Sequence, residues 1–209
     1  DIDGETASDQ SGHSVSLSSD GTIVAIGGPY NAGAGTDAGH VRVYEYDGTS
    51  WNQLGDDIDG EDDNDWSGYS VALSSDGTIV AISATGSDTW AGSISVYEYN
   101  GTSWNQIGST IVGEEDDEMG TSISLSSDGT IVAIGAYATD SYTGTVRVFE
   151  NNNTSTTDKT VTITGTTLTD GTAILTAGTL TATTLTDGTA TLTAGALTSV
   201  TTITASGAV

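Results

Sequence analysis

A stretch of sequence that occurs three times, at residues 14–26, 70–82 and 122–134, is the feature that most constrains this chain. The first copy opens with Ser-Val-Ser-Leu, which alternates polar with apolar residues, and every copy continues with Ser-Ser-Asp-Gly and then the largely apolar run Thr-Ile-Val-Ala-Ile. The alternation predicts a half-buried β-strand, and the apolar run predicts a strand covered on both faces. Because Asp-Gly pairs favour positive φ angles, we expect a type I′ hairpin in each copy.

The repeat extends beyond these hairpins and defines three units, residues 1–56, 57–109 and 110–150. The units open alike, with Ile-Asp-Gly-Glu twice and Ile-Val-Gly-Glu once, and residues 44–54 return almost unchanged as residues 97–107. Agreement of this length indicates a repeated architecture and not low complexity.

Each complete unit is expected to hold four strands, which in the first unit are residues 14–17, 22–26, 41–46 and 51–54. Trp51 recurs as Trp104, and we expect this tryptophan to pack between units. No part of the units has helical periodicity. Four antiparallel strands in each repeat of ~40–60 residues are typical of a propeller blade, so the predicted fold class is all-β.

Residues 67–84, Ser-Gly-Tyr-Ser-Val-Ala-Leu-Ser-Ser-Asp-Gly-Thr-Ile-Val-Ala-Ile-Ser-Ala, resemble the FG-GAP repeats of integrin-α-like β-propellers. Gly68 matches the glycine of the family's opening pair, and Gly27-Gly28-Pro29 matches its closing Gly-Ala-Pro. The resemblance covers residues 1–150 and implies propeller blades. The family's calcium loop lies between the first two strands; here it is Ser-Ser-Asp-Gly, which offers fewer oxygen ligands than the roughly 6–8 that calcium takes.

Three blades fall short of the ~4–8 that close a propeller ring. We therefore expect a longer chain that supplies further blades, with an open or oligomeric assembly as the alternative.

The composition changes after residue 150. Residues 151–159 read as a polar linker, and residues 160–209 are rich in Thr, Ala, Leu and Gly with a 17-residue period. Alternating Thr with Leu or Ile between Asp-Gly turns predicts a β-solenoid or an intertwined β-stalk. These repeats resemble the stalks of viral and phage tail fibres, which implies a homo-oligomer, expected to be a trimer.

The charge of the chain excludes several partners. It carries 29 acidic and 3 basic side chains, a formal net charge of −26. Such a surface repels nucleic acid and anionic lipid, so we expect neither as a partner. No apolar run approaches the roughly 20 residues of a membrane span, which predicts no membrane insertion. With no cysteine and two histidines, nucleophilic and phosphoryl-transfer catalysis lack their usual groups, so we predict that the protein is not an enzyme.

Blade topology predicts that the linkers between units and the loops after each second strand share one rim. Long loops on one side of a rigid scaffold often carry a binding site. The acidic loop contributes Asp59, Glu61 and Asp63, and Asp88 could join from the neighbouring loop, as oxygen ligands for a possible calcium ion. The alternative is a solvated acidic loop that keeps the protein soluble.

Aromatic residues are predicted on the same rim, namely Tyr30, Trp66, Trp90 and Tyr142. Trp66 and Trp90 do not recur between units, unlike Trp51. An indole beside carboxylates suits a sugar ring, through stacking and hydrogen bonds, so these four residues form the predicted ligand site. The alternative is that each aromatic residue folds against its own blade.

Together these features predict a non-enzymatic fibre or adhesin on a cell or virion surface. Its partner would be a cell-surface glycan or a protein receptor, bound by the blades as a head on the β-stalk. The alternatives are a structural filament or surface-layer component without a soluble ligand and, less favoured, a carbohydrate-active enzyme.

Overall fold

The computed structural model describes residues 1–86 and 90–150. The chain divides into two units, Asp1–Thr154 and Ser155–Val209. Asp88, the linker at residues 151–159 and the predicted stalk at residues 160–209 lie outside the described residues. Among the described residues, no helix has the length and apolar character needed to cross a bilayer.

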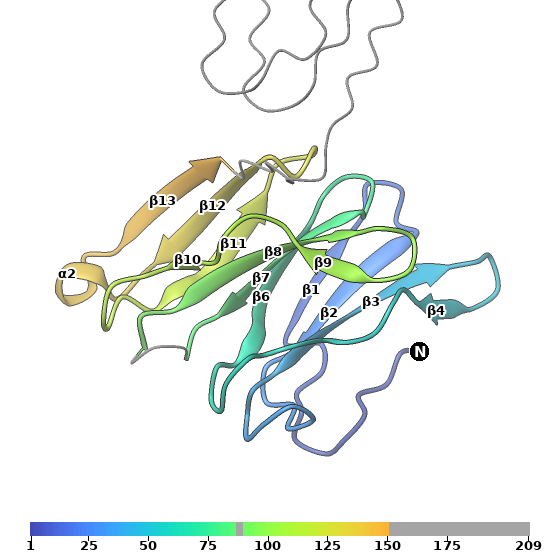
Figure 1. Ribbon diagram of the computed structural model, residues 1–209, viewed down its shortest axis with the longest axis horizontal. Coiled ribbons are helices and arrows are strands. Elements are labelled where there is room, and N and C mark those ends of the chain that lie inside the picture. Colours follow the sequence, from blue (N-terminus) through green and yellow to red (C-terminus); the bar gives the residue numbers. More distant parts are fainter. Residues whose placement is uncertain (87–89, 151–209) are drawn as a thin grey trace, which may run out of the picture. The chain divides into compact units, whose positions relative to one another are not determined.

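Three antiparallel sheets lie side by side (Figure 1). The first is built from five strands: β1 (Ser14–Leu17), β2 (Ile23–Gly28), β3 (His40–Tyr46), β4 (Trp51–Gln53) and β5 (Ile58–Asp59). The second repeats it with β6 (Ser67–Leu73), β7 (Ile79–Ala84), β8 (Ser93–Tyr99), β9 (Trp104–Gln106) and β10 (Ile111–Val112). The third contains β11 (Met119–Leu125), β12 (Ile131–Ala136) and β13 (Thr145–Glu150).

The described region is therefore all-β and propeller-like, as the sequence predicts. Its labelled helix is α2 (Thr139–Tyr142), a single turn between β12 and β13 in which Asp140 and Ser141 have positive φ angles. All three triplicated hairpins are strands, with neighbours paired antiparallel in register.

Residues 1–56 hold the four predicted strands, β1 to β4, but the first sheet gains a fifth, β5, from the next unit, and the second sheet gains β10 in the same way. Strand β5 pairs with β3, with Ile58 opposite Val41, and β10 pairs with β8, with Ile111 opposite Ile94. The opening residues of one unit therefore belong to the sheet of the unit before it. This pairing depends on the position of the chain after it leaves one sheet for the next, which the local pattern does not encode.

Apolar side chains fill the space between successive sheets. Between the first two, Val41 and Val43 of β3 are at most 1% exposed and share a cluster with Val71 and Leu73 of β6. Full burial of such a side chain contributes roughly 1.5–3 kcal/mol. Trp104 packs against this cluster and its Nε1–H donates to the carbonyl oxygen of Leu54 at 2.7 Å, which confirms its predicted place between units.

The predicted type I′ turns are wrong. Of the Asp-Gly pair in the first hairpin only Gly21 has a positive φ, 73°, and the amide of Gly21 donates to the carbonyl oxygen of Ser18 at 3.0 Å. The Asp20 carboxylate explains the wider loop, because it accepts from the Ser18 hydroxyl at 2.7 Å and from the amide and hydroxyl of Thr22 at 3.0 and 2.8 Å. Capping by a side chain favours this conformation over the tight turn.

The same carboxylate-centred turn occurs in all three hairpins. Hydrogen bonds lower the pKa of these groups because they favour the charged form. The Thr22 amide is the largest cause at Asp20, whose pKa falls to about 2. The Ser126 hydroxyl is the largest cause at Asp128, whose pKa also falls to about 2, and the Ser74 hydroxyl lowers the pKa of Asp76.

We predict that the three turns make folding sensitive to acid. Their folded pKa values lie below the unfolded value of about 3.9, so their stabilising contribution is present above that value and disappears as pH falls toward about 2. A variant with Asn at Asp20, Asp76 and Asp128 should keep the turns, because Asn100 accepts the amide protons of Thr102 and Ser103 at 2.9 and 3.0 Å in a similar loop.

Thermal unfolding between pH 6 and pH 2 measures the effect. The variant should lose less melting temperature than the wild type below pH 4. A control with three exposed carboxylates replaced by Asn, at Asp62, Asp116 and Asp140, matches the charge change. Equal acid sensitivity of the two variants would contradict the prediction.

Candidate functional site

Backbone hydrogen bonds hold the loops at one rim of the sheets together. The amide of Trp66 donates to the carbonyl oxygen of Asp37 at 3.2 Å, and that of Gly86 donates to Asp65 at 3.0 Å. One sheet further along, the amide of Glu118 donates to Trp90 at 2.9 Å. The unit linkers and the loops after the second strands therefore share a rim, as topology predicts.

Three of the four predicted aromatic residues form a continuous row. The ring centroids of Tyr30 and Trp66 lie 5.6 Å apart, and those of Trp66 and Trp90 lie 4.8 Å apart in an edge-on arrangement. Trp90 remains 45% exposed. Tyr142 has its described ring contact elsewhere. It is the last residue of α2, its ring centroid lies 5.9 Å from that of Tyr137, and it is 72% exposed.

The backbone at both tryptophans is left-handed, with φ of 56° at Trp66 and 66° at Trp90. This conformation is unusual for bulky residues. At the position of Trp66 the other units have Gln10 and Glu118, with φ of 52° and 46°. Because the same loop forms around three different side chains, the loop does not require an indole, and the tryptophan is free to serve another role.

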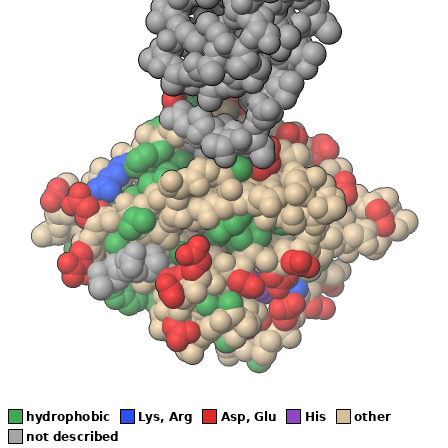
Figure 2. Space-filling view, in the orientation of Figure 1, with side chains coloured by type: hydrophobic (Ala, Val, Ile, Leu, Met, Phe, Trp, Pro, Cys, Tyr) green, Lys and Arg blue, Asp and Glu red, His purple; other side chains and the backbone are tan. Residues whose placement is uncertain are grey.

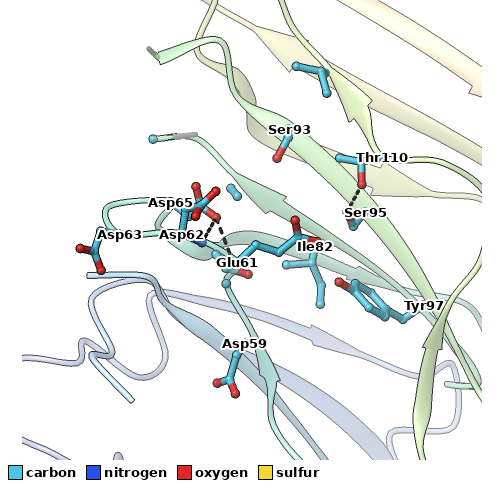
Figure 3. Close-up of a pocket in the computed structure, with 15 residues that line it drawn as sticks. Asp59, Glu61, Asp62, Asp63, Asp65, Ile82, Ser93, Ser95, Tyr97 and Thr110 are labelled. Atoms are coloured by element: carbon cyan, nitrogen blue, oxygen red, sulfur yellow. Dashed lines mark hydrogen bonds between the residues drawn. The ribbon is translucent and has the colours of Figure 1, made fainter. Parts of the chain in front are cut away.

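A cavity of about 450 Å³ lies beside the acidic loop (Figure 3). Asp59, Glu61 and Asp63 line it, together with side chains of the second sheet that include Ser95 and Tyr97. Figure 2 shows that Asp and Glu side chains recur across the visible face of the molecule. The cavity therefore lies in a region of negative potential.

The loop around this cavity is organised by the buried carboxylate of Asp65. It is 7% exposed and accepts from the amides of Glu61 and Asp62 at 3.1 and 2.9 Å. Asp117 accepts from the amide of Glu114 at 3.3 Å, and Asp9 accepts from the amide of Thr6 at 2.8 Å. These three aspartates have a recurring structural role.

Three of the four predicted calcium ligands, Asp59, Glu61 and Asp63, line the cavity without forming one compact set. Asp63 accepts from the amide of Thr36 at 2.8 Å, and in Figure 3 both Asp59 and Asp63 point away from Glu61. Asp88 lies outside the described residues. Burial raises the pKa of Asp59, and the nearby charge of Asp57 adds to this increase.

The described residues do bring three possible ligand atoms within 4.8 Å of one another elsewhere, at Glu5, His40 and Asp57. His40 is 1% exposed, and its Nδ1 lies 3.3 Å from a carboxylate oxygen of Asp57. The guanidinium of Arg42 lies 3.7 Å from Glu5, so positive charge is already present at this cluster. Sequence reasoning missed it because its members come from three distant segments and His40 does not recur.

A difference between the units accounts for the cavity. In the first unit, Arg42 donates to the carbonyl oxygen of Asp3 at 2.8 Å, pairs with Glu5 and lies 5.6 Å over the ring of Tyr44. In the third unit, Arg147 pairs with Asp117 at 3.0 Å. The second unit has Ser95 at this strand position.

The partners of the missing arginine remain in the second unit. Glu61 corresponds to Glu5, Tyr97 corresponds to Tyr44, and both line the cavity. Burial raises the pKa of Tyr97, and the negative charge of Glu61 raises it further. The cavity is thus an acid-lined space at the place that a guanidinium fills in the first unit, which suits a positively charged group.

Comparison with known proteins gives only distant likenesses. No family model matches the chain, and no curated protein matches it. A putative 6-phosphogluconolactonase from Bacteroides uniformis is 14% identical, with a TM-score of 0.46, over 66% of this chain and 36% of that one. TolB from Acinetobacter baumannii is 15% identical, with a TM-score of 0.42, over 69% and 31%.

A thermostable family-43 glycoside hydrolase is 17% identical, with a TM-score of 0.39, over 65% of this chain and 52% of that one. The chain thus spans between about a third and a half of the length of these structures. None of these likenesses assigns an activity to it.

We predict that Ser95→Arg fills the cavity and pairs with Glu61, as Arg42 pairs with Glu5. The free energy of unfolding should rise by up to about 1 kcal/mol, because the pair is partly exposed, and the gain should shrink in high salt. Urea unfolding at low and high salt measures it. Ser95→Gln controls for side-chain volume without charge, and an equal effect of the two variants would refute the pairing.

Proposed function

We propose that residues 1–150 form a non-catalytic binding head that takes a carbohydrate at the rim of its sheets. The observation that carries this proposal is the row of Tyr30, Trp66 and Trp90, with ring centroids 5.6 and 4.8 Å apart. Trp66 stands in the chain between Asp65 and Ser67, which both line the acidic cavity. The aromatic row is therefore next to the carboxylate oxygens of the cavity, which can accept hydrogen bonds.

A sugar ring requires both kinds of group. Its C–H face packs on an aromatic ring, and its hydroxyl groups donate to carboxylates such as Glu61 and Asp62. The net charge of −26 repels acidic polysaccharides. The proposed ligand is consequently a neutral glycan or one that carries amino groups.

The absence of catalysis is part of the proposal. His40 is buried beside Asp57, and His13 packs on Tyr69 with ring centroids 4.8 Å apart. Neither histidine is among the residues that line the cavity. The carboxylates there have hydrogen-bonding and electrostatic roles in binding.

The proposed setting is the surface of a cell or virion, with the head displayed on an adhesin or fibre. This setting rests on the resemblance of residues 1–150 to FG-GAP repeats and of residues 160–209 to fibre stalks. A structural filament or surface-layer component is the alternative, and it would bind no soluble glycan.

Replacing either tryptophan should weaken glycan binding by about tenfold or more, because stacking on the indole is lost; tenfold corresponds to about 1.4 kcal/mol. A glycan array with neutral, amino-bearing and acidic members would identify the ligand, and calorimetry would then compare wild type with Trp66→Ala and Trp90→Ala. Trp51→Ala, in which the lost ring packs on Tyr46 at 5.3 Å in the first sheet, is the matched control.

Unchanged binding in both rim variants would overturn the proposed site. Wild-type protein that binds no glycan would favour the structural alternative. Release of reducing sugar from a polysaccharide panel, lost on Glu61→Gln, would show a glycosidase and overturn the non-catalytic assignment.

The cavity supports a second proposal, a bound cation. The specific observation is that Arg42 fills the equivalent place in the first unit, whereas Ser95 leaves Glu61 without that partner. Calcium is the proposed ion because the lining is rich in carboxylate and hydroxyl oxygens, which suit this hard cation.

Calcium should bind with a dissociation constant of about 0.1–1 mM, the range of weak extracellular modules. Titration calorimetry should show this signal for the wild type and for the control Asp116→Asn, and lose it in Glu61→Gln and Ser95→Arg. A flat trace to several millimolar calcium in the wild type would exclude calcium here and leave the glycan proposal standing.

A further inference from the structure

The contact between neighbouring sheets is the same at both boundaries inside the chain. At the first boundary, Val41 and Val43 of β3 pack with Val71 and Leu73 of β6. At the second, Ile94 and Val96 of β8 share a cluster with residues of the third sheet, including Ile123 and Leu125 of β11. The apolar face formed by the second and third strands of one sheet thus packs on the face formed by the first and second strands of the next.

The first and last sheets expose the two halves of this contact. Val15 and Leu17 of β1 are 63% and 59% exposed, although their counterparts Val71 and Leu73 are only 7% and 8% exposed.

At the other end, Val146 and Val148 of β13 are 72% and 65% exposed, although their counterparts Val41 and Val43 are 0% and 1% exposed. Four apolar side chains that the fold buries elsewhere are therefore left in solvent, which marks interaction surfaces.

Backbone groups show the same complementarity. At the two internal boundaries, the amide of Ser19 donates to the carbonyl oxygen of Ser75 at 2.8 Å, and that of Ser75 donates to Ser127 at 2.9 Å. Within the described residues, no further sheet supplies a partner for this bond at either end, so the amide of Ser127 and the carbonyl oxygen of Ser19 do not form it. One end offers a donor and the other an acceptor.

The rim loops carry the opposite polarity, because here the earlier unit accepts and the next unit donates. The carbonyl oxygens of Ala38 and Ala91 accept from the amides of Ser67 and Met119 in the next unit, at 2.9 and 3.1 Å. The carbonyl oxygens of Gly39 and Gly92 accept from Gly60 and Gly113, at 2.8 and 2.9 Å. At the ends of the described region, Thr143 and Gly144 correspond to these acceptors, and Ser11 and Gly4 correspond to these donors.

We propose that the exposed face of β13 in one copy of the chain packs on the exposed face of β1 in a second copy, and that the reverse contact closes the pair. Ile2 and Asp3 of each copy would then add to β13 of the other, as Ile58 and Asp59 add to β3. This pair, and not the trimer that the stalk resemblance implies, is the proposed assembly; it goes beyond the proposed binding function and does not depend on it.

The repeated contact between sheets explains both why the partner is a second copy of the chain and why two copies close into a ring. A second copy carries the missing half of each face, with matching apolar side chains and matching hydrogen-bond polarity. Two identical ends carry the same half of the apolar contact and the same donor and acceptor positions, so they cannot reproduce the contact of the internal boundaries. Two copies of three sheets give a ring of six, within the ~4–8 sheets of closed propellers, and closed symmetric pairs are the commonest oligomers.

The experiment measures the mass of the full 209-residue chain by sedimentation at micromolar concentrations. The wild type should have twice the 21.1 kDa mass of one chain. Val15→Asp and Val148→Asp each place a charge on one exposed face and should both give single chains. Asn105→Asp adds the same charge on an exposed position of β9 and should remain paired.

A mixture of the two variants tests whether β13 of one copy contacts β1 of the other. Val15→Asp keeps an intact β13 face and Val148→Asp keeps an intact β1 face, so an equimolar mixture should recover pairs through one contact. Their circular dichroism should match that of the wild type, because both substituted positions are exposed.

Four results would overturn the proposal. The first is a wild type that stays a single chain, and the second is a wild type larger than two copies. The third is pairing that survives both substitutions and so uses another surface. The fourth is pairing abolished by one substitution but not the other, which would show contact between identical ends.

Discussion

The burial of one aliphatic strand face by the next sheet holds this molecule together. Val41 and Val43 meet Val71 and Leu73 at one boundary, and the equivalent residues meet at the next. Both faces of a sheet carry apolar side chains, so a sheet needs a neighbour on each side to bury them. Repetition of this contact is therefore the condition for folding, and it leaves two unsatisfied faces at the ends of any open series.

The candidate site lies where units with the same backbone carry different side chains. The left-handed residue just before the first strand of each sheet is Gln10, Trp66 or Glu118, and of these only Trp66 joins an aromatic row. At one position of the third strand, Arg42 and Arg147 are replaced by Ser95, which leaves a cavity with its carboxylates. The second unit thus keeps the scaffold but loses a structural cation, and the candidate site lies where that cation is missing.

The sequence predicted the strands well and the local details less well. Periodicity and the triplicated hairpins placed the strands, and topology placed Trp66 beside Trp90. The turn type was wrong because the Asp20 side chain, and not the backbone alone, sets the loop. The strand at Ile58 and the cluster around His40 were missed because both depend on segments that only the tertiary fold brings together.

The proposed pairing of chains and the proposed binding site use different parts of the molecule. The exposed valines lie on β1 and β13, whereas Trp66 and Trp90 lie at the rim of the second sheet. Closing the ring would leave both sites accessible and would place two of them on one rigid body. Two linked sites raise the apparent affinity for a multivalent surface well above that of one site. If the proposed function holds, a shallow aromatic row with a small acidic cavity would therefore suffice for attachment to a dense glycan surface, although each single contact is weak.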